Sequence, residues 1–341
     1  MSDEASDSGS GLSGYRYATG WHCVGWGDEL EVGEVKKLHY FGQDLVAFRG
    51  ESERAFVLDP HCRHLGGHLG VGGTVKGDCI VCPWHLWHWN GDGSHHLVPY
   101  SKERHIPHLA IYSWPLREWC GMLLVWHDRH RRPPHWEPPE VPEHENPGYY
   151  PFPPSRMVHR VKVHPQMIIE NAADPYHIPP VHHGHAPETT SFGTKGHHLH
   201  ATIRTVYGQG KKSTWLTPDG PLAADITYDT YGLGIGFVRF PKNTLESVQI
   251  TAHTPVDEEY TDYYFMQSSA REPGDEGEEP AGKAAKFLKA QQQLVQQDFP
   301  IWENMKYLDE PYFVPEEASD FLELRRWARQ LFPPETLPEG S

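Results

Sequence analysis

The sequence predicts an α+β fold in two parts, an all-β domain followed by a domain with an antiparallel sheet and helices. Its 341 residues exceed the size of most single domains, so two hydrophobic cores are expected. Short apolar runs broken by glycine occupy the first third, nine prolines crowd into residues 131–155, and longer alternating stretches and one helical pattern follow.

The first part, from Tyr15 to about Trp126, is expected to form a compact all-β domain. Leu45–Arg49, Ala55–Leu58 and Met122–Trp126 are short apolar or alternating runs typical of strands. The proline-rich residues 131–155 suit neither a helix nor a central strand and are expected to be a linker. The predicted organisation is therefore a disordered tail at 1–14, a first domain at 15–130, the linker at 131–155 and a second domain at 156–341.

The second part alternates polar and apolar residues in a way that predicts an antiparallel sheet. Strands are expected in four segments that are rich in tyrosine, phenylalanine, isoleucine and threonine, namely Ala201–Tyr207, Ile235–Phe240, Val248–His253 and Asp262–Met266. Gly274–Pro280 is an acidic loop. Ala281–Asp298 is rich in alanine, lysine, leucine and glutamine, with apolar residues at helical intervals, and is expected to be a helix.

Composition narrows the classes of function. The chain has 30 Lys and Arg against 46 Asp and Glu, a net charge of -16, which disfavours nucleic acid as a partner. Its longest apolar stretches are too short to span a membrane, and the first residues lack the order of a secretory signal. Five cysteines without such a signal favour reduced thiols, so a soluble, cytoplasmic protein is expected.

Two Cys/His pairs lie in the all-β part. Cys62 and His64 have one residue between them, Cys82 and His85 have two, and 17 residues separate the pairs. Two cysteines and two histidines on a pair of loops can bind structural zinc or hold a Rieske 2Fe-2S cluster, with both cysteines on one iron and both histidines on the other. Zinc loops usually separate paired ligands by two to four residues, so the spacing favours the cluster.

Cys79 offers a competing interpretation, because Cys79 and Cys82 form a C-x-x-C pair. The pair lacks the strand-to-helix context of redox motifs and would take a ligand from the cluster. Cys23 and Cys120 are expected to be small core residues.

A second group of metal-binding residues follows the linker. Glu170, Asp174 and His177 are spaced i, i+4 and i+7, which predicts one helical face. Pro179 and Pro180 are expected to end this helix, so that the next turn brings His182 toward His177. Two histidines and a later carboxylate would form a 2-His-1-carboxylate iron site with open positions, and Asp298 at the end of the late helix is the candidate. The alternative is a polar helix end with surface histidines.

Taken together, these motifs resemble the large subunits of Rieske non-heme iron oxygenases. Within them the sequence is most similar to the oxygenase component of 3-ketosteroid 9α-hydroxylase and its sterol-processing relatives. Nearly the whole chain takes part in the similarity, through the segments Gly20–Gly25, Cys62–Gly67, Pro83–Trp89, Gly121–His127, Asn171–Asp174, Asp298–Trp302 and Leu324–Trp327.

The resemblance implies a Rieske domain followed by a catalytic domain of helix-grip type. It implies that Cys62, His64, Cys82 and His85 bind the 2Fe-2S cluster. It further implies that His177, His182 and Asp298 bind one Fe(II). Asn171 and Asp174 are expected in the catalytic machinery, with Asp174 linking His177 to His85 of a neighbouring subunit in a homotrimer.

The resemblance also implies the reaction and its partners. A ferredoxin reductase-type donor would pass electrons from NADH, O2 would be the cosubstrate, and a hydrophobic, steroid-like molecule would be hydroxylated. Desaturation or demethylation of another substrate stays an alternative, as does a Rieske electron-transfer protein without oxygenase activity. The residues 183–200 are expected to be a loop, either a gate or an ordinary exposed loop.

The chain departs from the family pattern at a few positions. Gly67 and Trp84 stand where the Rieske proteins of respiratory complexes have disulfide cysteines, which favours the oxygenase subclass. Leu86 stands where the family usually has Gly or Asp, and His88 where it often has Arg. Pro179–Pro180 replaces aromatic or apolar residues, so a different substrate pocket is expected.

Overall fold

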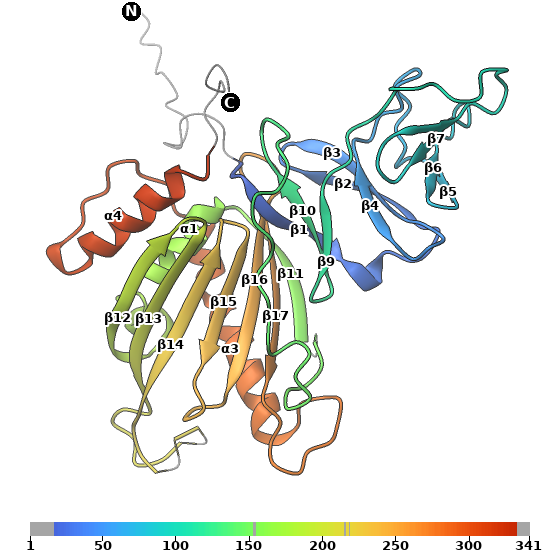
Figure 1. Ribbon diagram of the computed structural model, residues 1–341. Helices are drawn as coiled ribbons and strands as arrows, with labels where there is room; N and C mark the ends of the chain where they lie inside the picture. Colours follow the sequence, from blue (N-terminus) through green and yellow to red (C-terminus); the bar gives the residue numbers. More distant parts are fainter. Residues whose placement is uncertain (1–16, 153–154, 215, 218, 333–341) are drawn as a thin grey trace, which may run out of the picture. The chain divides into compact units, whose positions relative to one another are not determined.

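The computed structural model describes residues 17–152, 155–214, 216–217 and 219–332 (Figure 1). The chain divides into two compact units, one of residues 21–138 and 254–258, the other of residues 139–253 and 259–341 together with the first 20. The short segment Thr254–Glu258 falls in the range expected for the second domain. It joins the first unit because its Pro255 and Val256 carbonyls accept hydrogen bonds from the backbone of Phe41 and Gly42, each at 2.9 Å.

The first unit is built from three small sheets, as expected for an all-β domain. Their strand orders are β1-β10-β9, β2-β3-β4 and β5-β6-β7-β8. The strands are β1 (Gly20–Trp26), β2 (Val35–Tyr40), β3 (Gln43–Arg49), β4 (Ala55–Leu58), β5 (Thr74–Lys76), β6 (Cys79–Val81), β7 (His88–Asn90), β8 (His95–Leu97), β9 (Leu116–Trp119) and β10 (Met122–His127), with a 3-10 turn η1 (Gly27–Glu29). The three strands expected from the sequence are confirmed in β3, β4 and β10.

Apolar side chains of β3, β4 and β6 form the core of the first unit. Val46, Phe48, Leu58 and Ile80 are almost completely buried, and Cys62 and Cys82 belong to the same cluster. The cysteines precede tight turns whose backbones are fixed by this core. The packing therefore anchors both Cys/His pairs to one hydrophobic core.

The second unit is dominated by a seven-stranded sheet of order β11-β17-β16-β15-β14-β13-β12 (Figure 1). The strands are β11 (Ser155–Val161), β12 (His185–Lys195), β13 (His198–Tyr207), β14 (Leu222–Tyr231), β15 (Ile235–Phe240), β16 (Ser247–Pro255) and β17 (Thr261–Ser269). Pairing is antiparallel from β12 to β16 and between β11 and β17. The four strands expected in this part are confirmed in β13, β15, β16 and β17, whereas β11, β12 and β14 were not predicted.

Helices cover one face of this sheet. They are α1 (Pro165–Ile169), η2 (Glu170–Ala173), α2 (Ile178–His182), α3 (Gly282–Trp302) and α4 (Pro315–Arg329). The expected helix at Ala281–Asp298 is confirmed in α3, which continues for one further turn. Its buried residues Phe287, Gln291 and Asp298 recur at helical intervals and face the sheet. Within the described residues, no helix is long and apolar enough to cross a membrane.

The expected loop at residues 183–200 is wrong. These residues form most of a β-hairpin, since β12 and β13 pair from His185–Val206 to Lys195–His198, with irregular register near Glu188 and Thr189. Glycine, threonine and proline suggested a loop, but β12 is the edge strand of the sheet, where proline is tolerated. An edge strand held by pairing along its length offers no basis for a gating loop.

Candidate functional site

The two Cys/His pairs lie on loops with the same backbone pattern. In the first, between β4 and β5, the N–H of Gly66 donates to the Cys62 carbonyl (2.9 Å), and the N–H of Cys62 donates to the Gly67 carbonyl (2.9 Å). In the second loop, between β6 and β7, the N–H of Leu86 donates to the Cys82 carbonyl (3.1 Å), and the N–H of Cys82 donates to the Trp87 carbonyl (2.8 Å). Each cysteine therefore starts a tight turn that presents its histidine two or three residues later.

These four side chains come together. The rings of His64 and His85 lie 4.5 Å apart between centroids, and both cysteine side chains are 2% exposed. The Nδ1 atom of His64 is buried with no hydrogen-bond partner. A Cβ atom at Gly67 would lie 3.2 Å from the Cys82 sulfur, so a side chain there would crowd the space beside the thiol. An orphaned imidazole nitrogen and a cleared space beside a buried thiol fit a 2Fe-2S cluster.

The competing redox pair of Cys79 and Cys82 finds no support in this geometry. The Cys79 thiol donates to the Asn90 Oδ1 atom at 3.2 Å, and no disulfide joins it to Cys82. Burial raises the pKa of the Cys79 thiol, so it is not a ready nucleophile. Burial also raises the pKa of the Cys62 thiol, and neighbouring Cys82 acts in the same direction. A bound metal would be needed to hold the two neighbouring thiols as thiolates.

The departure at Leu86 has a conformational consequence. Leu86 has a φ of 57°, and its counterpart Gly66 in the first loop has a φ of 76°. A side chain in this left-handed region costs on the order of 1 kcal/mol, which glycine avoids. The same turn in both loops therefore explains why a small residue is the easier choice at position 86.

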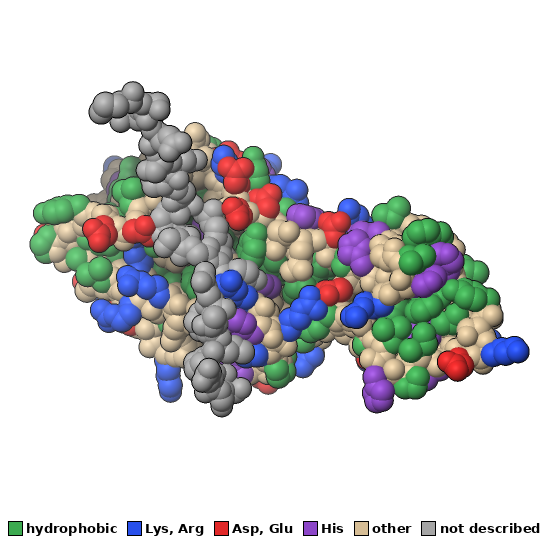
Figure 2. Space-filling view, turned by 90° about the horizontal axis from the view of Figure 1, so that it is seen from above, with side chains coloured by type: hydrophobic (Ala, Val, Ile, Leu, Met, Phe, Trp, Pro, Cys, Tyr) green, Lys and Arg blue, Asp and Glu red, His purple; other side chains and the backbone are tan. Residues whose placement is uncertain are grey.

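Exposed apolar side chains surround the paired loops. Figure 2 shows hydrophobic side chains beside histidines over the part of the chain that holds β5–β8. The apolar residues most exposed on these loops are Leu65 (58%), Val71 (62%), Trp84 (61%) and Leu86 (54%). His64 itself stacks on Trp87, with ring centroids 4.6 Å apart and planes 5° from parallel.

The helix expected to run through Glu170, Asp174 and His177 is wrong. It ends as the 3-10 turn η2, and Asp174 already has non-helical dihedral angles (φ -116°, ψ 88°). This break precedes Pro175, whose ring disfavours helical geometry in the residue before it. Pro179 and Pro180 do not end a helix either. They lie in the first turn of α2, where backbone N–H groups have no acceptor within the helix, so the N–H that proline lacks is not missed.

The structure brings His177, His182 and Asp298 together by this different route. His177 precedes α2, His182 is its last residue, and Asp298 projects from α3, with all their ligand atoms within 4.8 Å of one another. The two imidazole rings lie 5.2 Å apart, and His182 Nε2 lies 3.3 Å from Asp298 Oδ1. This donor set, two imidazoles and one carboxylate, is the chemistry that non-heme Fe(II) sites use.

A hydrogen bond from Nδ1 holds each of the two imidazole rings in place. The Nδ1–H of His177 donates to the Asp174 carbonyl at 2.5 Å, and the Nδ1–H of His182 donates to Gln297 Oε1 at 3.1 Å. Each ring then keeps Nε2 for a metal. Sequence reasoning missed Gln297, although its place beside Asp298 was the available signal. Burial lowers the pKa of His182, but the contact with Asp298 outweighs this and raises it.

Asp174 contacts His177 differently from the expectation. Its Oδ1 atom accepts the backbone N–H groups of Tyr176 (2.9 Å) and His177 (3.2 Å), as a capping carboxylate does. Its Oδ2 atom lies 3.5 Å from His177 Nδ1, farther than the carbonyl of the same residue. The carboxylate remains 28% exposed. Asp174 thus shapes the turn that carries His177 and orients its ring through the backbone.

Glu170 is occupied elsewhere. Its carboxylate accepts two hydrogen bonds from the Arg325 guanidinium, at 2.8 and 3.1 Å, and one from Gln166 at 3.2 Å. This buried ion pair joins η2 to α4. Glu170 is therefore a structural residue rather than an alternative metal ligand.

A cavity of about 180 Å³ opens beside the His177–His182–Asp298 group, between α3 and the sheet. Asn171, which the sequence analysis assigned to the catalytic machinery, lines this cavity. Its walls are mainly apolar and aromatic, with a few amides and hydroxyls, among them Ile226, Tyr228, Phe237, Phe240, Gln249, Thr251, Tyr263, Gln291, Leu294 and Trp302. Such a lining suits a hydrophobic small molecule held by few polar contacts. The sequence did not identify these wall residues.

Both parts of the chain match known protein families. Residues 20–115 match the Rieske [2Fe-2S] domain, and residues 125–332 match the 3-ketosteroid 9alpha-hydroxylase C-terminal domain. A 3-ketosteroid-9-alpha-monooxygenase oxygenase component of Rhodococcus rhodochrous is 32% identical over 326 residues, which cover 93% of this chain and 82% of the relative.

Two further comparisons bear on reaction and fold. The cholesterol 7-desaturase nvd 1 of Ciona intestinalis is 36% identical over 180 residues, 52% of this chain and 37% of that protein. Dicamba monooxygenase bound to 3,6-dichlorosalicylic acid superposes with a TM-score of 0.70 at 16% identity, over 93% of this chain and 97% of that one, and shares the fold. The chain belongs to the 3-ketosteroid 9α-hydroxylase family of Rieske oxygenases and is the oxygenase component of a Rieske-type monooxygenase.

Proposed function

We propose that this oxygenase hydroxylates a steroid-like substrate in the cavity beside His177, His182 and Asp298. The observation that carries the proposal is that these three side chains form part of the wall of a largely apolar cavity. The 3-ketosteroid monooxygenase relative, similar over most of both chains, supports a steroid as the substrate class. Fe(II) held by the three side chains would supply the activation of O2.

The chain's own residues have distinct tasks in this proposal. Cys62, His64, Cys82 and His85 hold the 2Fe-2S cluster that receives electrons from a separate NADH-dependent reductase. Gln297 and the Asp174 carbonyl keep the Nε2 atoms of the two histidines directed at the iron. The apolar cavity walls position the substrate and exclude bulk water.

Product identification tests the proposal. Purified oxygenase with a reductase, NADH and O2 should convert at least one compound of a 3-ketosteroid panel to a product heavier by one oxygen atom. Asp298→Ala protein should keep the cluster spectrum, lose about one iron per chain and form no product. No turnover of any steroid by iron-replete protein, with turnover of a non-steroid, would overturn the substrate class.

Desaturation is the second candidate, and the similarity to a cholesterol 7-desaturase over half of the chain favours it. Hydroxylation adds one oxygen atom to the substrate, whereas desaturation removes two hydrogen atoms, so mass spectrometry separates them. A product lighter by two hydrogen atoms, formed without a hydroxylated intermediate, would replace the monooxygenase outcome by the desaturase outcome.

We further propose a homotrimer in which Asp174 links His177 to the partner subunit's His85. The 28% exposed carboxylate of Asp174 and the exposed apolar side chains around His85 support this arrangement. Asp174→Asn protein should hold both metals yet lose turnover, and mixing it with His85→Ala subunits in one oligomer should restore part of the activity. Normal turnover by Asp174→Asn, or an active monomer, would contradict the relay and leave Asp174 as a capping residue.

The cytoplasm is the proposed location. Cys62, Cys79 and Cys82 are buried thiols that form no disulfide, which suits a reducing compartment. Fractionation of the producing cells should find the protein with cytoplasmic markers.

A further inference from the structure

A second group of two histidines and one carboxylate lies in the sheet of the second unit. His198 and His200 are two residues apart on β13, so their side chains leave the same face of the strand. Asp229 lies on β14 directly opposite His200. This is the other face of the sheet from the catalytic cavity, since Tyr228 and Thr230, the neighbours of Asp229, line that cavity.

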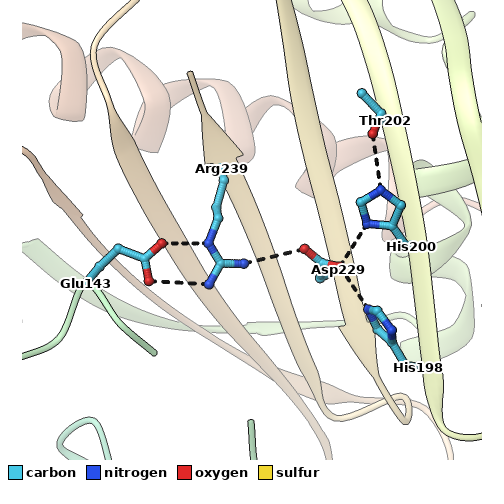
Figure 3. A network of polar contacts seen from close by, with 6 residues as sticks. All are labelled: Glu143, His198, His200, Thr202, Asp229 and Arg239. Carbon is cyan, nitrogen blue, oxygen red and sulfur yellow. Dashed lines mark hydrogen bonds and ion pairs between the residues drawn. The ribbon is translucent and has the colours of Figure 1, made fainter. Parts of the chain in front are cut away.

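The two imidazoles converge on one carboxylate oxygen of Asp229 (Figure 3). His198 Nε2 lies 2.8 Å and His200 Nδ1 lies 2.9 Å from the same Asp229 Oδ1 atom. All three ligand atoms lie within 4.8 Å of one another. The His198 ring stacks on Tyr231, with centroids 4.6 Å apart. Stacking on Tyr231 and the contacts with Asp229 thus hold the two partly exposed imidazoles in place.

The neighbouring charges of Arg239 and Glu143 leave the Oδ1 atom of Asp229 available to bind a cation. Arg239 approaches only the second oxygen of Asp229, with its Nη1 atom 3.4 Å from Oδ2. Its guanidinium is turned mainly to Glu143, whose carboxylate it contacts at 2.7 and 3.4 Å. The positive charge of Arg239 is therefore largely balanced by Glu143, and Oδ1 of Asp229 remains directed at the two histidines (Figure 3).

Thr202 supplies the outer contact that a metal-bound imidazole uses. Its Oγ1 atom lies 3.3 Å from His200 Nε2. If His200 Nδ1 bound a metal, the ring proton would move to Nε2 and donate to this hydroxyl. Ligating histidines regularly donate their second N–H in this way.

We propose that His198, His200 and Asp229 bind a divalent transition metal ion of the zinc type, separate from the catalytic iron. Zn–N and Zn–O bonds of about 2.0–2.1 Å in a tetrahedron place ligand atoms about 3.3 Å apart. The present 2.8 and 2.9 Å separations must open by only about half an ångström. The histidine side chains, 34% and 40% exposed, have room for this shift and for a water as fourth ligand.

Zinc binding to the iron-loaded holoenzyme tests the site. Equilibrium dialysis against buffered free Zn²⁺, with metal analysis of the protein, should find one zinc per chain beside the normal iron content. His200→Ala and Asp229→Asn should weaken that binding at least tenfold. His197→Ala is the matched control, because it removes the neighbouring imidazole from the turn before β13 and should bind zinc normally.

Two further measurements locate the zinc. A His177→Ala/His182→Ala protein should still bind it, since the catalytic iron site is not involved. Zinc X-ray absorption of the wild-type complex should show two imidazole ligands. His198→Ala serves as a second variant if another misfolds, with the cluster spectrum as the check of integrity. Unchanged zinc binding in His198→Ala and His200→Ala, no zinc at 100-fold molar excess, or loss only in the His177/His182 protein would overturn the site. None of these outcomes depends on turnover, so they are independent of the proposed steroid hydroxylation.

Discussion

The ion pair between Arg325 and Glu170 offers a quantitative test of how the catalytic segment is anchored. Arg325→Met removes the charge while keeping a long side chain. It leaves the Glu170 carboxylate buried with Gln166 as its remaining polar partner. The two partner side chains are only 8% and 11% exposed, so solvent cannot replace the lost contacts.

The expected loss of stability follows from that burial. Breaking a buried ion pair by removing one partner typically costs about 3–5 kcal/mol, because the other charge stays desolvated. Arg325 also donates to the Leu308 carbonyl at 2.7 Å, and that acceptor would lose its partner too. For a unit of this size, 3 kcal/mol corresponds to a fall of roughly 6 to 12 °C in melting temperature.

Far-UV circular dichroism should report the melting of the second unit, and the visible absorbance of the cluster should report the first. Arg204→Met is the matched control. Arg204 holds Asp225 with two hydrogen bonds of 2.8 and 2.9 Å, but these side chains are 50% and 45% exposed. Solvent screens that pair, so its loss should not measurably shift the melting temperature.

A double variant separates the buried charge from lost packing. Glu170→Gln in the Arg325→Met background neutralises the orphaned carboxylate and should recover at least half of the lost stability. The reasoning would be refuted if Arg325→Met melted like Arg204→Met, or if the double variant were less stable than Arg325→Met alone.

Three further predictions concern the metal sites. Cys62→Ala should abolish the red-brown cluster absorbance, whereas Cys79→Ser should keep it, and a bleached Cys79→Ser protein would contradict the ligand assignment. Gln297→Ala should weaken iron binding about 10- to 100-fold without changing the cluster spectrum, because His182 loses the partner that orients it; unchanged iron affinity in a titration would count against that role. In iron-free protein the raised pKa of His182 should add stability below about pH 6.5 that disappears as the pH rises through the raised value. Since protons compete with iron for Nε2, iron affinity should fall as the pH drops through that value, and Asp298→Asn should lower the pH at which iron-free protein loses this stability.

Local sequence patterns predicted the residues that we propose for both metal sites. The Cys62–His64 and Cys82–His85 spacings depend on tight turns, which are set by a few neighbouring residues, so the pairs could be read without tertiary structure. The helical spacing of Phe287, Leu288 and Leu294 likewise predicted α3 before its packing partner was known. Alternation predicted most strands of the sheet for the same reason, because side-chain direction along a strand is a local property.

Tertiary structure decided what local patterns leave open. The prolines at 175, 179 and 180 are compatible with either the end or the start of a helix, and packing selected a break at Asp174 and a short helix ending at His182. Residues 185–195 look like a loop until the pairing with β13 supplies their backbone hydrogen bonds. Gln297, the Glu170–Arg325 pair and the His198–His200–Asp229 group join residues that only the fold brings together, because contacts between distant elements leave no period in the sequence.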